Sequence, residues 1–376
     1  MLGFFKKALE SRVYGLDHAL LNIQLPPATL WMNMGYWKDT EDFPEACQAL
    51  LDLVLGAGLG REEIDSQSVS ILDVGCGCGD QSIRIASLKR GEKSSFSAGR
   101  SFSSASASAS RSGFDALDNS ANAAISRRTD VARFNPPPRA LVDTYVGITL
   151  QASQAEIGQR RIGLHQQQSS RTQTTATTTR DIPSESNYHI FCADAANPST
   201  WTGDLQTSIS TMIPSSSSSP SSPTTSLTAN PHTTWLLALD TLYHFQPSRL
   251  PILHYANTTL HASFMAFDLL LADQSSVWQR LKLRLVCLVT GAPFANFLTC
   301  EQYVQLLVEA GYERDRVEIV DISPDVFPGI TRFLQRRIRE ARPFGLKLGK
   351  FRGAKSVFGW WARSGIVRGV VVVARK

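Results

Sequence analysis

Short apolar runs alternate with segments of helical periodicity along most of the chain. The predicted strands lie at residues 69–74, 140–150, 187–194, 234–245, 262–273, 316–323 and 367–376. Helical periodicity is found at about 80–89, 153–164, 248–261 and 300–312. Strands that alternate with helices and read as apolar runs form parallel sheets whose two faces are both covered. The pattern therefore predicts an α/β fold, Rossmann-like, with a seven-stranded, mostly parallel sheet flanked by helices.

Two segments lack the apolar content that a folded core requires. Residues of about 89–139 and about 203–231 are rich in Ser, Thr, Ala and Pro, so burial cannot offset the entropy of ordering them. We interpret both as disordered surface insertions, and the polar tract at 166–186 as an extended loop. Residues 1–68 are expected to form a helical cap that carries the aromatic stretch "LWMNMGYW", and residues 69–376 the main domain.

Composition and charge limit the possible binding partners and cellular location. The 376-residue chain is 43% hydrophobic and has a formal net charge of +5. Its densest basic stretch, 332–355, fits a solvated helix face better than a contact with phosphate or an anionic membrane. The six cysteines form no dense framework and the N-terminus becomes charged too early for a signal peptide, so we expect free thiols and a cytoplasmic location. No apolar stretch is long enough to predict a membrane span.

The sequence "ILDVGCGCGD" at 71–80 places a glycine turn directly after the first predicted strand. Ligands of such sheets bind at the carboxyl ends of the strands, and glycines let the backbone approach a ligand without Cβ collisions. Gly75, Gly77 and Gly79 read G-x-G-x-G. The dinucleotide fingerprint G-x-G-x-x-G would need a glycine where Asp80 stands, and a Walker loop would need G-K-S or G-K-T. Both of these readings are therefore disfavoured.

Two cysteines, Cys76 and Cys78, alternate with these glycines. A zinc site would need a second Cys or His pair at suitable spacing, and the chain offers none. We therefore predict no metal here and interpret both cysteines as small side chains packed behind the loop.

The turn resembles motif I of the class I S-adenosylmethionine-dependent methyltransferases. The most specific feature is Asp73, an acidic residue two positions before the first glycine and at the end of a strand. The resemblance implies S-adenosylmethionine as the cofactor. It also implies that Asp73, Gly75, Gly77 and Gly79 belong to the cofactor site, with the glycine backbone against the methionine part of the cofactor.

Later segments match the same family in the expected order. "VGITLQASQAEIG" resembles the second-strand segment and implies that Thr149 and Gln154 lie near the ribose, where many relatives have a carboxylate instead. "FCADAANPSTW" resembles the third-strand segment and implies that Asp194, followed by Ala195, lies at the adenine. "LTCEQYVQLLVEAGYERDRVEIVDIS" resembles the usual late helix and strand. These matches cover most of the chain outside the two insertions.

The fourth-strand segment and the aromatic stretch point to the small-molecule branch of this family. "LALDTLYHF" resembles the motif that lines the methyl-transfer face, with Asp240 and Tyr243 as cofactor-site residues and Asp240 suited to the methionine amino group. Sugar O-methyltransferases of natural-product pathways and tocopherol-type C-methyltransferases also begin with a helical cap that carries a "GYW"-like motif. Aromatic faces favour a sulfonium cation, which makes Tyr36 and Trp37 candidate cofactor contacts. The alternative is that both rings only pack the cap onto the sheet.

Methyl transfer to a hydroxyl or an acidic carbon requires a base, for which a histidine is well suited. His244 follows the fourth strand, at the expected mouth of the site, and Asp268 lies on the fifth strand. The matching positions in natural-product sugar O-methyltransferases hold a His and an Asp. The resemblance thus implies His244 as general base and Asp268 as its partner or as a substrate anchor. The alternative is that His244 packs against Tyr243 and Phe245.

The segment after the fifth strand bears on the acceptor. Apolar residues recur at helical spacing there, at Trp278, Leu281, Leu285 and Leu288, with basic residues between them. This face fits a lid over an apolar acceptor, a helix at a membrane surface or ordinary core, and lid or core is favoured. We expect a small, apolar organic acceptor and no nucleic acid, because neither a concentrated basic groove nor an asparagine-proline-proline-aromatic motif occurs.

The sequence thus predicts methyl transfer from S-adenosylmethionine to the oxygen or carbon of a small acceptor. A catalytically inactive protein that keeps the cofactor pocket as a regulator is the alternative. A nicotinamide-dependent oxidoreductase is disfavoured by the spacing of the glycine turn.

Overall fold

The computed structural model describes residues 27–60, 67–90, 139–174, 187–213 and 232–376, apart from residue 347. The strands of this part are β1 (Ser68–Val74), β2 (Thr144–Thr149), β3 (Tyr188–Cys192), β4 (His232–Leu239), β5 (Ser263–Leu271), β6 (Val317–Asp321) and β7 (Val367–Ala374). The helices of this part are α2 (Phe43–Leu59), α3 (Asp80–Ser87), α4 (Ala152–Thr174), α5 (Gly203–Ser210), α6 (Leu250–Thr258), α7 (Val277–Thr290), α8 (Cys300–Glu309), α9 (Ser323–Ala341) and α10 (Gly349–Ser364).

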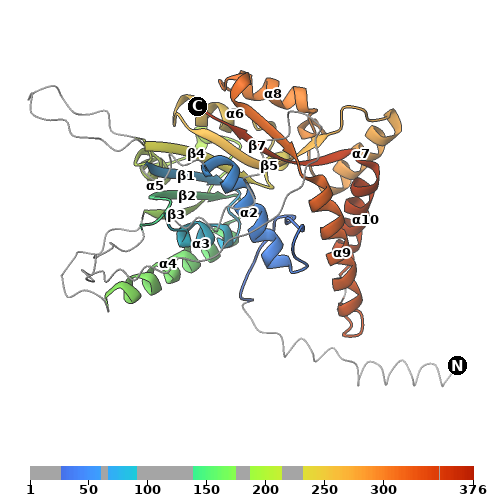
Figure 1. The fold of residues 1–376 in the computed structure, drawn as a ribbon, viewed down its shortest axis with the longest axis horizontal. Coiled ribbons are helices and arrows are strands. Elements are labelled where there is room, and N and C mark those ends of the chain that lie inside the picture. Colours follow the sequence, from blue (N-terminus) through green and yellow to red (C-terminus); the bar gives the residue numbers. More distant parts are fainter. Residues whose placement is uncertain (1–26, 61–66, 91–138, 175–186, 214–231, 347) are drawn as a thin grey trace, which may run out of the picture.

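The seven strands form one sheet in the order β3-β2-β1-β4-β5-β7-β6 (Figure 1). All neighbouring strands are parallel except β7, which runs antiparallel to both β5 and β6. The predicted seven-stranded, mostly parallel sheet is therefore confirmed. The strand order reverses between β1 and β4, and such a reversal is where ligands of open α/β sheets bind.

Helices cover both faces of this sheet, and successive residues of a strand point to opposite faces. In β1, Ile71 packs into one core cluster and Leu72 into the other. In β4, Leu237 and Leu236 divide in the same way. The first cluster contains residues of α2, α3, α7 and α10, and the second contains residues of α5, α6 and α8. Because both faces are buried at the centre of the sheet, β4, β5 and β7 contain continuous apolar runs, whereas the edge strands β3 and β6 are only partly buried.

Local signals fix where several helices begin. Asp42 caps α2 by accepting a hydrogen bond from the backbone N–H of Glu45. Ser276 and Thr299 begin α7 and α8 with reciprocal capping boxes that involve Gln279 and Gln302. Each cap satisfies backbone donors that the first helical turn leaves unpaired.

Three sequence expectations need correction. The second insertion does not begin at Gly203, because Gly203–Ser210 form α5, whose Leu205 and Ile209 are buried against the sheet. The tract at 166–186 is not an extended loop throughout, because α4 continues to Thr174. The described part of the cap is not all helical, since residues 27–42 run without a helix before α2 begins. Residues 1–26, 91–138 and 214–231 lie outside the described residues.

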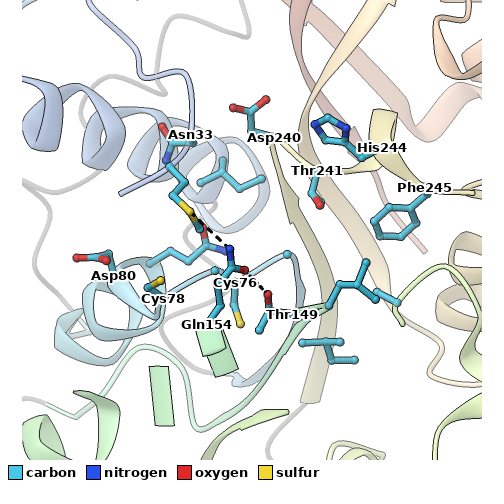
Figure 2. A pocket seen from close by; sticks show the side chains of 18 of the residues that line it. Asn33, Cys76, Cys78, Asp80, Thr149, Gln154, Asp240, Thr241, His244 and Phe245 are labelled. Carbon is cyan, nitrogen blue, oxygen red and sulfur yellow. Dashed lines mark hydrogen bonds between the residues drawn. The ribbon is translucent and has the colours of Figure 1, made fainter. Parts of the chain in front are cut away.

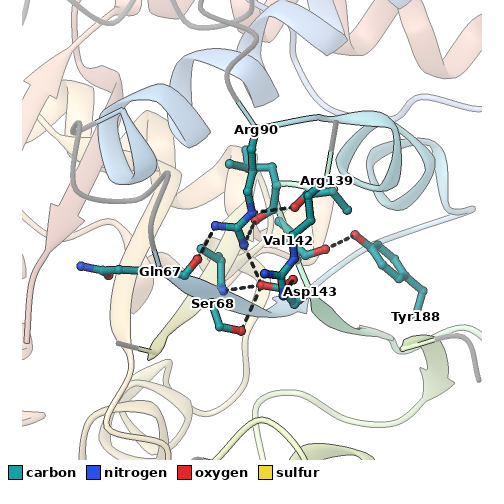
Figure 3. Close-up of polar contacts among 10 residues, drawn as sticks. Gln67, Ser68, Arg90, Arg139, Val142, Asp143 and Tyr188 are labelled. Atoms are coloured by element: carbon teal, nitrogen blue, oxygen red, sulfur yellow. Dashed lines mark hydrogen bonds and ion pairs between the residues drawn. The ribbon is translucent and has the colours of Figure 1, made fainter. Parts of the chain in front are cut away.

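The first insertion leaves and re-enters the domain at one point, beside the amino ends of β1 and β2. Lys89 and Ala140 form an antiparallel bridge there. The guanidinium of Arg90 donates hydrogen bonds to the backbone oxygen of Ala140, at 2.9 Å, and to the carboxylate of Asp143, at 2.7 Å (Figure 3). Asp143 also accepts hydrogen bonds from the Ser68 hydroxyl and from the backbone N–H of Val69. This polar cluster joins the two ends of the insertion to the strands.

Candidate functional site

A cavity of about 650 Å³ lies at the carboxyl ends of the parallel strands (Figure 2). Its walls come from the turn after β1, the end of β2, the residues after β3 and β4, and the segment before α2. Polar side chains in this lining are Asn33, Asp80, Gln81, Thr149, Gln154, Asp194, Asp240, Thr241, His244 and Gln246. Its volume falls within the usual range of small-molecule pockets.

The turn after β1 requires glycines for backbone reasons. Gly75, Gly77 and Gly79 all have positive φ, at 86°, 58° and 87°. A Cβ on Gly75 would lie 2.6 Å from the Thr241 hydroxyl, and one on Gly79 would lie 3.0 Å from the Cα of Gly158 in α4. Gly75 and Gly77 line the cavity, whereas Gly79 allows the turn to pack closely against α4.

Asp73, at the end of β1, is buried behind this turn and does not line the cavity. Its carboxylate is fully buried and accepts hydrogen bonds from the Gln81 amide, at 2.7 and 2.8 Å, and from the Tyr145 hydroxyl, at 2.5 Å. Burial raises its pKa to about 6, although both hydrogen bonds act in the opposite direction. The structure therefore places Asp73 where it joins β1 to α3 behind the turn, and its assignment to the cofactor site stays a prediction.

Two carboxylates hold the segment before α2 over the cavity. Asp80 accepts a hydrogen bond from the backbone N–H of Leu30, at 3.0 Å, and is paired with Arg161, at 2.6 and 2.8 Å. Asp240 accepts a hydrogen bond from the backbone N–H of Met34, at 2.8 Å. These contacts place Leu30, Trp31, Met32 and Asn33 in the wall of the cavity. These four residues belong to the aromatic stretch "LWMNMGYW", of which only Tyr36 and Trp37 were predicted as cofactor contacts.

The polar groups expected at the ribose and adenine lie together in the cavity. The Thr149 hydroxyl donates to the Gln154 amide oxygen at 2.7 Å, and both side chains face the cavity (Figure 2). Asp194 and Ala195 form another part of the wall. One oxygen of Asp194 accepts a hydrogen bond from the backbone N–H of Ala196 at 2.9 Å.

Asp240 is the carboxylate of the cavity whose protonation is most perturbed. Desolvation by burial raises its pKa to about 7, and the charge of Asp268 adds to the rise. Hydrogen bonds from the Tyr243 hydroxyl, at 3.0 Å, and from the backbone of Met34 act against it. Tyr243 thus contacts Asp240 from outside the cavity and does not line it. A bound cation would ionise Asp240 and compensate its burial.

His244 lies in the short turn Leu242–His244 after β4 and lines two cavities at once. The second cavity, of about 940 Å³, lies between α7 and α10 and is lined mainly by apolar side chains. Its lining includes Leu285, Val286 and Val289 of α7, Ala354, Val357, Phe358 and Trp361 of α10, and Met34, Tyr243 and Phe297. Desolvation lowers the pKa of His244, which favours the neutral imidazole.

Asp268 does not lie in either cavity and is not placed to orient His244. Its side chain is fully buried and forms an ion pair with Arg249. It also accepts a hydrogen bond from the Tyr303 hydroxyl at 2.9 Å. Burial raises the pKa of Asp268, whereas the charge of Arg249 lowers it. The expectation of a His244–Asp268 pair is therefore replaced by an internal ion pair that joins β5 to the residue before α6.

Tyr36 and Trp37 also lie away from the first cavity. Trp37 is buried against Phe43 and Phe333, with ring centroids 6.3 and 5.4 Å apart, and donates to the backbone oxygen of Met34 at 2.8 Å. Tyr36 packs beside Asp325, and its pKa is raised to about 12, mainly by burial. The structure thus favours the packing alternative, in which these rings fix the segment before α2 against α9.

Eight of the residues expected at the site line the first cavity, namely Gly75, Gly77, Thr149, Gln154, Asp194, Ala195, Asp240 and His244. Those expected there that do not line it are Tyr36, Trp37, Asp73, Gly79, Tyr243 and Asp268. Cys76 and Cys78 are buried and line the cavity, and all six cysteines are free. Among the described residues, no cluster of three or more His, Cys, Asp or Glu side chains could hold a metal ion. None of the described helices is long and apolar enough to cross a membrane.

Comparisons with known proteins agree with this architecture. No protein-family model matches the chain, and no curated protein matches it in sequence. Among solved structures, it is similar to one from Galdieria sulphuraria described as a sarcosine dimethylglycine methyltransferase (10% identity, TM-score 0.50, 96% of this chain and 98% of the other covered). It is also similar to the cyclopropane synthase MmaA2 from Mycobacterium tuberculosis (13% identity, TM-score 0.50, 92% and 90% covered).

These similarities extend over nearly the whole of each chain and concern the fold. The chain has the class I methyltransferase fold, with a mixed, mostly parallel sheet in the order 3-2-1-4-5-7-6. The resemblance drawn from the sequence is thus confirmed at the level of the fold.

Proposed function

We propose that the protein transfers a methyl group from S-adenosylmethionine to an oxygen or carbon of a small, apolar organic acceptor. The observation that carries this proposal is the junction at His244. The first cavity, which contains many polar side chains, and the mainly apolar cavity between α7 and α10 meet at this one side chain. Such an arrangement suits a reaction between a polar cofactor bound in the first cavity and an apolar acceptor bound in the second.

The residues of the first cavity fit this cofactor. Gly75 and Gly77 line the cavity without a Cβ, so their backbone can approach a ligand closely. Asp240, with a pKa of about 7, offers a carboxylate that gains a partner when an ammonium group binds. Thr149 and Gln154 would bind the ribose hydroxyls, and the second oxygen of Asp194 would accept a hydrogen bond from the adenine amino group. When bound, the cofactor supplies an electrophilic methyl group on a sulfonium.

His244 is the proposed general base. Partial desolvation lowers its pKa and so favours the neutral form, which can accept a proton. Its position between the cavities would place the imidazole beside an acceptor group that faces the first cavity. Among the described residues no carboxylate contacts the ring. Its orientation is instead fixed by the turn, in which its backbone N–H donates to the Thr241 oxygen at 3.0 Å, and by the neighbouring Tyr243 ring, 4.2 Å away between centroids.

Isothermal titration calorimetry with S-adenosylmethionine and S-adenosylhomocysteine tests the first half of the proposal. A panel of apolar phenols, terpenoids, quinones and lipids, followed by mass spectrometry for a gain of one methyl group, tests the second half. Binding together with methyl transfer is the expected result. Binding without transfer to any acceptor would favour the regulatory alternative, and absence of binding would refute the assignment of the first cavity.

A further inference from the structure

The outer side of α7 exposes a continuous apolar stripe. Trp278, Leu281, Leu285 and Leu288 recur at helical spacing and lie on one side of the helix. Trp278 is 79% exposed and Leu288 81% exposed, so neither belongs to the core, which was one of the roles expected from the sequence. The core-facing side of α7 consists of Leu283 and Cys287. Exposed apolar patches of this kind mark interaction surfaces.

Basic residues flank this stripe within α7 and are frequent in the neighbouring α10. In α7 they are Arg280, Lys282 and Arg284, and α10 adds Lys350, Arg352, Lys355 and Arg363. Neither helix contains an aspartate or a glutamate. In the described part of the chain, none of these seven cations forms an ion pair with a carboxylate. At helical spacing, Lys282 and Arg284 fall on opposite sides of the apolar stripe.

The two helices form one surface around the mouth of the second cavity. The Lys282 ammonium lies 4.7 Å from the ring centroid of Trp360 in α10, which joins the two helices. Leu285 and Val289 of α7 and Lys350 of α10 are exposed and also line the cavity. We call this surface, made of the apolar stripe of α7 and the seven cations, the α7–α10 face.

We propose that the α7–α10 face binds the surface of an anionic lipid bilayer, with the stripe in the interfacial region and the cations on the headgroups. An apolar stripe that contains a tryptophan and is bordered by Lys and Arg is the pattern of helices that lie in a membrane interface. A second copy of this chain is a poorer occupant, because it would bring seven further cations against the first seven. The bilayer would then meet the mouth of the second cavity, and entry of the acceptor by this route rests on the proposed function.

Vesicle sedimentation tests this inference without cofactor or acceptor. The full chain is incubated with phosphatidylcholine vesicles that contain no anionic lipid or about 30% phosphatidylglycerol. We expect binding that requires phosphatidylglycerol and weakens when salt is raised from about 0.1 M to about 0.5 M. The double variant Lys350→Gln/Arg352→Gln should bind about 30-fold more weakly, since each cation near the surface contributes about fivefold. Trp278→Ser/Leu288→Ser should lose about tenfold or more, because two exposed apolar side chains no longer enter the interface.

Matched controls lie in α4, which packs beside β3 at the other edge of the sheet. Leu164→Ser removes an apolar side chain that is 53% exposed, and Arg160→Gln removes an exposed cation. Both controls should bind vesicles as the unchanged protein does. Circular dichroism confirms that each variant folds, and titration with S-adenosylhomocysteine reports on the proposed function separately.

Three results would overturn the inference. They are no binding to either vesicle, equal losses in the α4 controls, and a dimer in sedimentation equilibrium that Trp278→Ser/Leu288→Ser dissociates. Loss of vesicle binding alone refutes the membrane contact and leaves the methyltransferase proposal standing. Absence of cofactor binding with vesicle binding intact does the reverse.

Discussion

The protonation of Asp240 makes the proposed cofactor site sensitive to pH. Its carboxyl lines the first cavity and has a pKa of about 7, raised chiefly by burial. A neutral carboxyl group cannot form an ion pair with an ammonium group. Cofactor binding should therefore be weak in acid and strengthen as the pH rises through the pKa of Asp240.

The magnitude follows from the ionised fraction of the free protein. With a pKa of about 7, Asp240 is roughly 3% ionised at pH 5.5 and roughly half ionised at pH 7. The ligand's α-amino group stays largely protonated over this interval, since such groups titrate near 7.7–8.0. The affinity for S-adenosylhomocysteine should thus rise about tenfold between pH 5.5 and 7. Stability of the free protein has the opposite sign, because a raised carboxyl pKa contributes stability below pH 4 that is lost as the pH rises through 7.

Titration calorimetry at several pH values, each in two buffers of different ionisation enthalpy, measures both the affinity and the proton released. The unchanged protein should release a proton on binding at pH 6, and Asp240→Asn should show neither the proton release nor the slope. Asp194→Asn is the matched control, since it removes another carboxylate of the same cavity and should lower affinity without changing the slope. His244→Ala should also keep the slope. A flat affinity in the unchanged protein, or a slope that survives in Asp240→Asn, would refute the role of Asp240.

Three further predictions test other parts of the site and core. Gly77→Val should abolish binding of S-adenosylhomocysteine while circular dichroism shows a retained fold, because a side chain there enters the cavity and meets Met32; unchanged affinity would contradict the assignment of the turn. His244→Ala should lower turnover by about 10²–10⁴-fold, measured with the acceptor found in the panel, and a loss below about threefold would mean that the residue only packs. Arg249→Met should lower the free energy of unfolding by about 3–5 kcal/mol in urea titrations, because Asp268 is left buried without its partner. The double variant Arg249→Met/Asp268→Leu should recover most of that loss, and a double variant as unstable as the single one would argue against the pair.

The sheet could be predicted because its central strands β4, β5 and β7 contain runs of apolar residues, and the glycine turn because its spacing is specific. The side-chain direction at the site could not be predicted in the same way. Asp73 and Trp37 lie within a few residues of the cavity, but both point away from it. Their partners, Tyr145 and Phe333, come from distant parts of the sequence. A motif locates a backbone segment, whereas tertiary packing decides which of its side chains reach the ligand.

Average composition concealed short ordered segments. In α5 the buried Leu205 and Ile209 lie four residues apart, which is one helical turn, within a segment otherwise rich in polar residues. A window that extends into the Ser- and Pro-rich residues after it dilutes this signal. The same effect hid the C-terminal part of α4, where the sequence is polar throughout.

The amino ends of the strands (the amino edge of the sheet) and their carboxyl ends (the carboxyl edge) have different neighbours in the sequence. The strands β1, β2, β3 and β4 are mutually parallel. In the sequence they follow, in this order, residues 61–66, 91–138, 175–186 and 214–231, which lie outside the described part of the chain. The described residues that flank these segments before the strands therefore lie at the amino edge. At residues 91–138, the longest of the segments, the ion pair of Arg90 with Asp143 joins the two flanking stretches. The candidate site lies at the carboxyl edge, in the turns that follow the same strands. Because the length of the strands separates these two edges, long polar additions enter the chain without displacing Gly75, Asp240 or His244, and the motif order stays readable across them.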